Sequence, residues 1–202
     1  ALVRRGGELM WVVDGQATPI EGGEVSEFVA SRDLSRYAYV SNGVVVVDGK
    51  QVEQGTTSCC PTFSLDGSRF GYIADGSVAV IDGVPQESQG SSVEHLIFSP
   101  EGSRSAYVAD GNTVVLDGGA QEQYDSVSAL TFSPDGSRFA YVANDSILVI
   151  DGEESEIGES TADQIAFSPD GTRVAYVKGD RKSGRVVLDG KEQKRHAFGC
   201  AE

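Results

Sequence analysis

The chain has 202 residues, which is enough for one well-buried domain or at most two small ones, and its composition is that of a globular protein. Its formal net charge of −15 would repel a phosphate backbone, so nucleic acid is not expected as a partner. No apolar run approaches the roughly 20 residues of a membrane-spanning helix, so no membrane span is expected.

One unit recurs along the whole chain, and it is recognised by columns of identical residues at nearly constant spacing. The phenylalanine column is 35, 35, 34, 35 and 31 residues apart: Phe28, Phe63, Phe98, Phe132, Phe167 and Phe198. The arginine column is Arg36, Arg69, Arg104, Arg138 and Arg173, and a tyrosine follows each arginine three residues later. Asp-Gly pairs begin at Asp14, Asp48, Asp82, Asp117, Asp151 and Asp189. Agreement in several columns establishes a repeat.

Each unit predicts four short strands. In the unit that starts near residue 129, an apolar first strand (129–133) leads through Pro-Asp-Gly-Ser, a type I turn signal, into an aromatic and β-branched second strand (138–143). The third strand (147–150) is apolar at every position, so both of its faces should be buried. Asp-Gly then predicts a two-residue hairpin turn into a polar fourth strand (153–157) that faces water.

Four antiparallel strands in each of several consecutive repeats are typical of a β-propeller blade. The chain begins inside a second strand and ends just after a first strand, so residues 194–202 and 1–20 are expected to form one composite blade. Five continuous blades over 21–193 complete the ring. The sequence therefore predicts an all-β, six-bladed propeller that is one domain over 1–202.

The segments "FSPDGSRFAYVA" (132–143) and "FSPDGTRVAYVK" (167–178) resemble the repeat of bacterial TolB-type propellers, which are WD-like repeats without the Trp-Asp pair. The resemblance covers nearly the whole chain. It implies the propeller fold and, as an expectation, a protein-binding platform in a bacterial protein. It supplies no binding residues.

The repeated polar residues are expected to be structural. The acid of the first turn should accept hydrogen bonds from local backbone N–H groups. The column arginines should lie over a neighbouring strand and bond turn carbonyls or the turn carboxylate. The column tyrosines should pack between blades. No catalytic motif is present, so no catalytic residue is predicted and the chain is not expected to be an enzyme.

No cofactor or metal site is predicted. The two histidines, His95 and His196, cannot be combined with other residues into a zinc site. The Asp-Gly turns are spread around a ring and do not converge as calcium ligands must, although a structural Ca²⁺ ion in the channel stays an alternative.

Loop variation indicates where binding would occur. The first and third turns of each unit are nearly the same in every blade and share one rim, which we call the turn rim. The second loops and the blade-to-blade loops differ between blades and share the opposite rim, the variable rim, where function is expected. The binding residues predicted there are Glu24, Cys60, His95, Asp163, Gln164, Arg181, Lys182 and Arg195.

Three cysteines are too few for a disulfide scaffold. Cys59 and Cys60 lie toward the variable rim and Cys200 toward the turn rim, at the two ends of first strands. An intramolecular bond to Cys200 would span a distance greater than the Cα separation of about 7 Å that a disulfide allows. The alternatives are buried free thiols, or an intermolecular contact in which Cys200 of one ring meets Cys59 or Cys60 of the next.

These observations favour a non-enzymatic binding or scaffold module of a secreted or periplasmic bacterial protein, with a protein or glycan partner. The chain begins at Ala1 rather than Met, which would suit a processed secreted chain or a trimmed piece. Two alternatives remain. The chain could self-associate as a head-to-tail filament, or it could be a glycan lyase or hydrolase whose best candidate group is His95, Asp163 and Arg195.

Overall fold

The computed structural model describes residues 2–5, 7–20, 24–52, 57–87, 89–158, 165–178 and 184–193, and these residues form β-strands and turns without a helix. The strands make six antiparallel sheets, five of four strands and one of three. The prediction of an all-β propeller built from four-stranded blades is confirmed.

The sheets follow one another in chain order. The first contains β1 (Leu2–Arg5), β2 (Glu8–Val13) and β3 (Gln16–Pro19). The second contains β4 (Val25–Ala30), β5 (Tyr37–Ser41), β6 (Val44–Val47) and β7 (Lys50–Gln51). The third contains β8 (Ser58–Phe63), β9 (Phe70–Ala74), β10 (Val78–Ile81) and β11 (Val84–Pro85).

The remaining three sheets have the same internal order. The fourth contains β12 (Val93–Phe98), β13 (Ser105–Ala109), β14 (Thr113–Leu116) and β15 (Gly119–Gln123). The fifth contains β16 (Val127–Phe132), β17 (Phe139–Ala143), β18 (Ile147–Ile150) and β19 (Glu153–Glu156). The sixth contains β20 (Ile165–Phe167), β21 (Val174–Lys178), β22 (Arg185–Leu188) and β23 (Lys191–Glu192).

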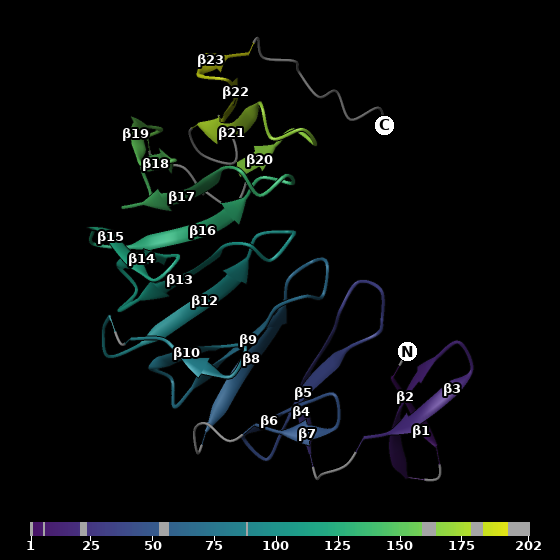
Figure 1. The fold of residues 1–202 in the computed structure, drawn as a ribbon. Coiled ribbons are helices and arrows are strands. Elements are labelled where there is room, and N and C mark those ends of the chain that lie inside the picture. Colours follow the sequence, from purple (N-terminus) through teal and green to yellow (C-terminus); the bar gives the residue numbers. More distant parts are fainter. Residues whose placement is uncertain are drawn as a thin grey trace, which may run out of the picture.

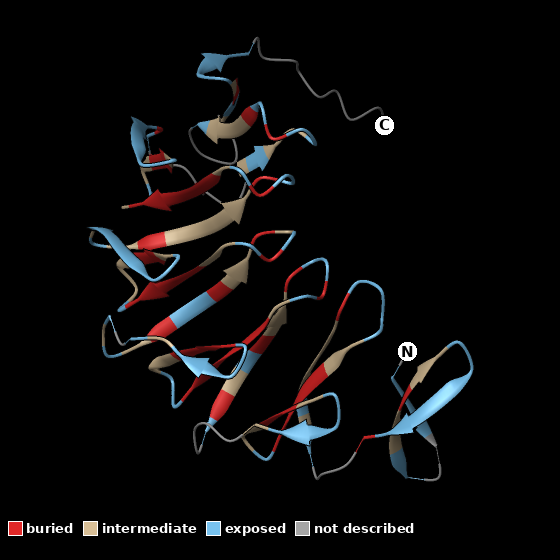
Figure 2. Ribbon diagram, in the orientation of Figure 1, coloured by how far each residue is buried: buried red, intermediate tan, exposed pale blue. Residues whose placement is uncertain are grey.

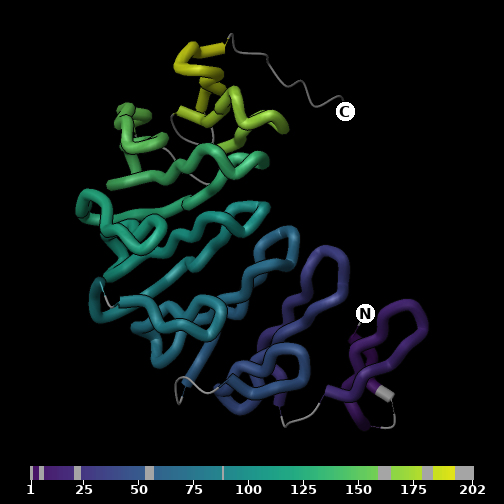
Figure 3. The backbone as a smooth tube through the Cα atoms, in the orientation of Figure 1, coloured from purple at the N-terminus to yellow at the C-terminus, as the bar shows by residue number. Residues whose placement is uncertain are grey.

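Figure 1 shows the six sheets along an arc, with β1–β3 at one end and β20–β23 at the other. The backbone tube in Figure 3 shows the same up-and-down path repeated in successive sheets. The strand that should complete the first sheet was expected from residues 194–202, which lie outside the described residues. The described part is thus an arc that is open between its ends, and the composite blade and the closed ring stay predictions.

Burial changes systematically across each four-stranded sheet (Figure 2). In the second to fifth sheets the second and third strands are largely buried, as in β9 and β10, whereas β21 and β22 of the sixth sheet are half-buried or exposed at most positions. The fourth strands are exposed at each described position. Neighbouring first strands contact one another, β4 with β8, β8 with β12 and β12 with β16, which places them on the inner side of the arc. The predictions of a buried third strand and a water-facing fourth strand are confirmed.

The hydrophobic core lies between sheets rather than inside one sheet. One cluster joins Ala38 and Val45 of the second sheet to Phe70 and Tyr72 of the third. Equivalent clusters form between the other neighbouring sheets. Four of the five column tyrosines are buried in these clusters, as predicted: Tyr39, Tyr72, Tyr107 and Tyr141. Tyr176 is half-buried at the edge of the cluster that contains Val142 and Leu148. Each sheet therefore depends on its neighbour for burial of its apolar faces.

The two turns of the turn rim adopt the conformations that their residues favour. The amide of Gly67 donates to the carbonyl of Ser64 at 2.9 Å, and Gly67 has a φ of 73°, which a residue without a Cβ adopts at low cost. In the Asp-Gly hairpin at Asp48 and Gly49 the φ values are 49° and 78°, as a type I′ turn requires.

The acid of each first turn bonds its own turn, as expected. The carboxylate of Asp66 accepts hydrogen bonds from the hydroxyl of Ser64 at 2.6 Å and from the amide of Ser68 at 3.0 Å. The buried hydroxyl of Ser64 in turn accepts the amide of Arg69 at 2.9 Å. Five turn acids have a lowered pKa because they accept such bonds: Asp33, Asp66, Glu101, Asp135 and Asp170.

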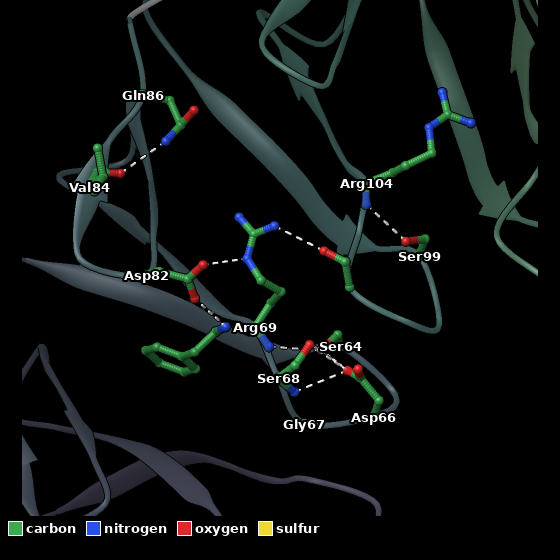
Figure 4. Close-up of polar contacts among 12 residues, drawn as sticks. Ser64, Asp66, Gly67, Ser68, Arg69, Asp82, Val84, Gln86, Ser99 and Arg104 are labelled. Atoms are coloured by element: carbon green, nitrogen blue, oxygen red, sulfur yellow. Dashed lines mark hydrogen bonds and ion pairs between the residues drawn. The ribbon is translucent and has the colours of Figure 1, made fainter.

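The column arginines hold neighbouring sheets together, in an arrangement that we call the arginine clasp (Figure 4). The Nε group of Arg69 bonds Asp82 of its own sheet, and its Nη1 group donates to the carbonyl of Gly102 in the next sheet at 2.9 Å. Its guanidinium carbon lies 5.6 Å from the ring centroid of Phe98 in that sheet. The expected bond to a turn carbonyl is thus present, and the carboxylate partner comes from the Asp-Gly hairpin.

The clasp recurs from sheet to sheet. The ion pairs within sheets are Arg36–Asp48 at 3.0 Å, Arg104–Asp117 at 2.9 Å, Arg138–Asp151 at 2.7 Å and Arg173–Asp189 at 2.8 Å. The guanidinium groups also cover the phenylalanines of the following sheet, in the pairs Arg36–Phe63, Arg104–Phe132 and Arg138–Phe167. Arg173 belongs to the last sheet, and its side chain is 55% exposed, against 33% for Arg36.

We predict that Arg36→Ala lowers the free energy of unfolding by about 1–3 kcal/mol, because it removes a carboxylate pair, a bond to the carbonyl of Gly67 and the contact with Phe63. Arg173→Ala removes a more exposed ion pair and should cost less than about 1 kcal/mol. Urea unfolding of both variants tests this, and a loss below about 1 kcal/mol for Arg36→Ala would contradict a clasp that acts between sheets.

Leu34 occupies the place that glycine has in the other first turns, and its φ is 60°. A residue with a Cβ costs about 1–2 kcal/mol of strain at this positive φ, and glycine avoids that strain. Part of this advantage of glycine is lost, because a glycine loses more backbone entropy on folding than a leucine does. We predict that Leu34→Gly raises the free energy of unfolding by about 0.5–1 kcal/mol. Leu65→Gly, at an exposed turn leucine without a positive φ, is the matched control and should not stabilise the chain.

The turn acids also predict an acid-labile contribution to stability. The hydroxyl of Ser31, followed by the amide of Ser35, lowers the pKa of Asp33 from 3.8 to about 2. Because the pKa is lower in the folded chain, this stabilisation is fully present above pH 3.8 and is lost as the pH falls toward 2. Ser31→Ala should raise the pKa of Asp33 in a carboxyl NMR titration, whereas Ser155→Ala on exposed β19 should leave it unchanged.

Candidate binding surface

The topology separates the two rims, as the loop pattern predicts. Antiparallel order within each sheet places the first and third turns at one rim and the second loops and blade-to-blade loops at the other. At the turn rim the serines, acids and arginines bond one another, as in Ser64, Asp66 and Arg69. The variable rim is therefore the better candidate for binding a partner.

Three of the eight predicted binding residues lie among the described residues. Glu24 is exposed and directly precedes β4. Cys60 and His95 are also exposed, and each is the third residue of its first strand, β8 and β12. The other five lie outside the described residues: Asp163, Gln164, Arg181, Lys182 and Arg195.

Cys60 and His95 occupy the same kind of β-bulge. The pairing of β8 with β9 shifts register between Cys59 and Thr62. The pairing of β12 with β13 and the pairing of β16 with β17 shift register at the equivalent positions. The bulge residue has a positive φ in all three strands, 61° at Cys60, 55° at His95 and 55° at Ala129. A bulge redirects the side chain from the regular alternation of a strand. The first strands thus present chemically different side chains at one repeated position.

Cys59 and Cys60 form a disulfide with each other. The expectation of buried free thiols is therefore wrong for this pair, since both sulfurs are bonded and Cys60 is exposed. The amide of Cys60 donates to the carboxylate of Glu27, in the preceding sheet, at 2.8 Å. Cys200 lies outside the described residues, so the predicted intermolecular contact through Cys59, Cys60 and Cys200 stays a prediction.

His95 has a different environment. Its side chain is 65% exposed, and its Nε2 atom lies 3.9 Å from a carboxylate oxygen of Glu94. Its expected enzymatic partners, Asp163 and Arg195, are outside the described residues. Across the described residues no group of three or more His, Cys, Asp or Glu side chains is arranged to hold a metal ion. The absence of a cofactor and the alternative of a channel Ca²⁺ ion both stay predictions.

In the third, fourth and fifth sheets, the loops of the variable rim are held by an acid or amide that follows the second strand. The carboxylate of Asp110 accepts hydrogen bonds from the hydroxyl of Ser91 at 2.8 Å and from the amides of Ser92 and Ser91 at 3.0 and 2.7 Å. The hydroxyl of Ser91, followed by the two amides, lowers the pKa of Asp110. Asn144 accepts the amides of Asp125 and Ser126 at 2.8 and 3.3 Å through its side-chain oxygen. The second loop of one sheet thereby fixes the chain that enters that sheet.

A hollow opens on this rim between the fourth and fifth sheets, and we call it the rim hollow. Its volume is about 460 Å³. It is lined by polar residues of one second loop, of the end of β15 with the blade-to-blade loop that follows it, and of the next second loop: Asn112, Gln123, Tyr124, Asp125 and Asn144. Amide, phenol and carboxylate groups together can bond hydroxyl groups or peptide groups of a ligand. Sequence reasoning missed this site because no single motif contains it.

Tyr124 fixes one wall of the rim hollow. Its hydroxyl donates to the carboxylate of Glu154 at 2.6 Å, and its ring packs edge-on against Tyr141 at a centroid distance of 6.1 Å. Burial, reinforced by Glu154, raises the pKa of its hydroxyl above the ordinary value of 10.0. The phenol therefore stays protonated and acts as a neutral hydrogen-bonding group.

A second hollow of about 460 Å³ lies between the second and third sheets. Its walls include Val47, Phe70 and Tyr72, which belong to the core between these sheets, and Arg36 and Asp82, which belong to arginine clasps. Because these side chains already stabilise the contact between sheets, the rim hollow is the stronger candidate for a binding site.

The described residues contain no helix that could cross a membrane. No family model matches the sequence, and no curated protein sequence matches it either.

Two solved structures resemble the fold. A protein assigned as TolB from Agrobacterium tumefaciens has a TM-score of 0.50 and 17% identity, over 87% of this chain and 80% of that chain. The tricorn protease has a TM-score of 0.58 and 12% identity, over 87% of this chain but only 22% of its own length. Both are β-propeller proteins. At these identities the likeness concerns the fold alone: this chain has a β-propeller fold that resembles those of the TolB protein and the tricorn protease.

Proposed function

We propose that the chain is a non-enzymatic binding module that takes its partner through the variable rim. The observation that carries the proposal is the rim hollow, where five polar side chains from three loops face one space. The loops are anchored by Asp110 and Asn144, so a partner meets a preorganised surface and loses less entropy on binding.

The chemistry of the rim hollow favours a neutral partner group. Asn112 and Gln123 offer amide donors and acceptors, and Asn144 offers its amide N–H groups, because its oxygen already accepts two backbone amides. Tyr124 offers an aromatic face beside them. Asp125 is the acid among the lining residues, which agrees with the acidic chain as a whole. A protein loop or a glycan, rather than a phosphorylated ligand, fits this set.

We further propose that the protein works outside the cytoplasm, in a secreted or periplasmic setting. The disulfide between Cys59 and Cys60 supports this, because disulfides persist in oxidising compartments and are rare in the cytosol. The likeness of the fold to TolB supports the same setting. It also supports the proposals that the chain is bacterial and that its partner is a protein.

Matched variants test the binding site. Gln123→Ala with Asp125→Ala removes one amide and one carboxylate from the rim hollow. Gln121→Ala with Glu153→Ala removes the same two groups from the exposed fourth strands β15 and β19. Partners isolated from an extract of the source organism, and glycans on an array, should bind the first variant about tenfold more weakly and the second variant normally.

Three results would contradict the proposal. Equal weakening by both pairs of substitutions would remove the rim hollow as the site. Turnover of a glycan by the unmodified chain would favour the lyase or hydrolase alternative. A mass that grows with concentration in size-exclusion chromatography, without any partner, would favour the self-assembling filament.

A further inference from the structure

The Cys59–Cys60 disulfide lies on the inner first strand β8, away from the rim hollow, and the proposed binding function does not use it. The bond joins adjacent residues, so it closes no loop between distant parts of the chain. Disulfides stabilise a fold mainly by restricting such loops in the unfolded chain. Stabilisation of the fold is therefore a weak explanation for this bond.

The fold provides its own control for this conclusion. The same bulge occurs in β12 with Glu94 and His95, and in β16 with Ser128 and Ala129. The bulge residues of all three strands have φ values between 55° and 61°. Neither β12 nor β16 has cysteine at these positions. The bulge thus forms without the disulfide, and the disulfide is an addition to it.

The two cysteines differ in exposure. Cys60 is exposed, whereas Cys59 is half-buried and packs against the core cluster that contains Ile73 and Val93. Thiol–disulfide exchange requires a thiolate to approach one sulfur in line with the bond, so access decides which sulfur is attacked. Because Cys60 is the exposed residue of the pair, we expect its sulfur to be the one that is attacked.

We propose that the Cys59–Cys60 disulfide is a reversible exchange site whose co-reactant is a protein dithiol. A thiolate of the dithiol attacks Sγ of Cys60, and the electron pair of the broken bond moves to Sγ of Cys59, which takes a proton from water. The second thiolate of the dithiol protein then attacks the first sulfur of that same protein, which is bonded to Cys60 in the mixed disulfide. This breaks the bond to Cys60, and the Cys60 thiolate leaves and takes a proton from water. The chain gains two electrons and two protons, and the dithiol becomes a disulfide.

Glu27 gives this site a preference among thiols. Its carboxylate accepts the amide of Cys60 at 2.8 Å, so it places a negative charge beside the attacked residue. An incoming anionic thiol is repelled and a cationic thiol is attracted over this short distance. The exchange partner of the site is therefore a dithiol with positive charge near its reactive sulfur.

The test uses the full chain with Cys200→Ser, which leaves Cys59 and Cys60 as its two cysteines. The isolated protein should resist alkylation until dithiothreitol is added and should then accept two alkyl groups. A thioredoxin-fold protein with a Cys-x-x-Ser site should form a stable mixed disulfide at Cys60, located by peptide mass analysis. Reduction should shift the melting temperature by no more than about 2 °C, because the bulge does not need the bond.

The control variant is Cys59→Ser with Cys60→Ala, which reproduces the Ser128–Ala129 pair of β16. It should keep the melting temperature and lose the mixed disulfide. Glu27→Gln should lower the ratio of the reduction rates with cysteamine and glutathione about threefold, since it removes the charge. The proposal is overturned if the isolated protein has free thiols, if the mixed disulfide forms at Cys59, or if none forms. It is also overturned if Glu27→Gln leaves the ratio of the two reduction rates unchanged, or if reduction unfolds the chain.

Discussion

The structure depends on the contact between neighbouring sheets. A four-stranded sheet whose second and third strands are apolar on both faces cannot bury them alone, so its neighbours must cover them. The arginine clasp fixes this contact at the turn rim, because one guanidinium group bonds a hairpin acid of its own sheet and covers a phenylalanine of the next. The repeated columns of the sequence are the parts of this one interface.

The same interface explains why the rims differ in chemistry. Serines, acids and arginines of the turn rim bond each other in the five four-stranded sheets, so substitution there weakens the contact between sheets. At the variable rim of the third to fifth sheets one acid or amide anchors the loops, as Asp110 and Asn144 show, and other positions can differ. Polar side chains therefore gather in the rim hollow without disturbing the stacking of the sheets.

Regular spacing made much of the fold predictable, including the strand order, the Asp-Gly turns and the buried tyrosines. The bulges were not predictable, because an inserted residue leaves the apolar pattern of a six-residue strand almost unchanged. Adjacent side chains of a regular strand point to opposite faces, so a bond between Cys59 and Cys60 was not expected until the bulge was known. The rim hollow combines three loops, and sequence spacing does not show that they meet.

When sheets touch only their neighbours, a sheet with a neighbour on either side opens by breaking two seams. The rim hollow lies across the seam of the fourth and fifth sheets, both of which have neighbours on either side. A molecule seated there would touch both sheets and brace that seam. Occupancy would then appear as slower amide hydrogen exchange in β14 and β17, without any change in the shape of the blades.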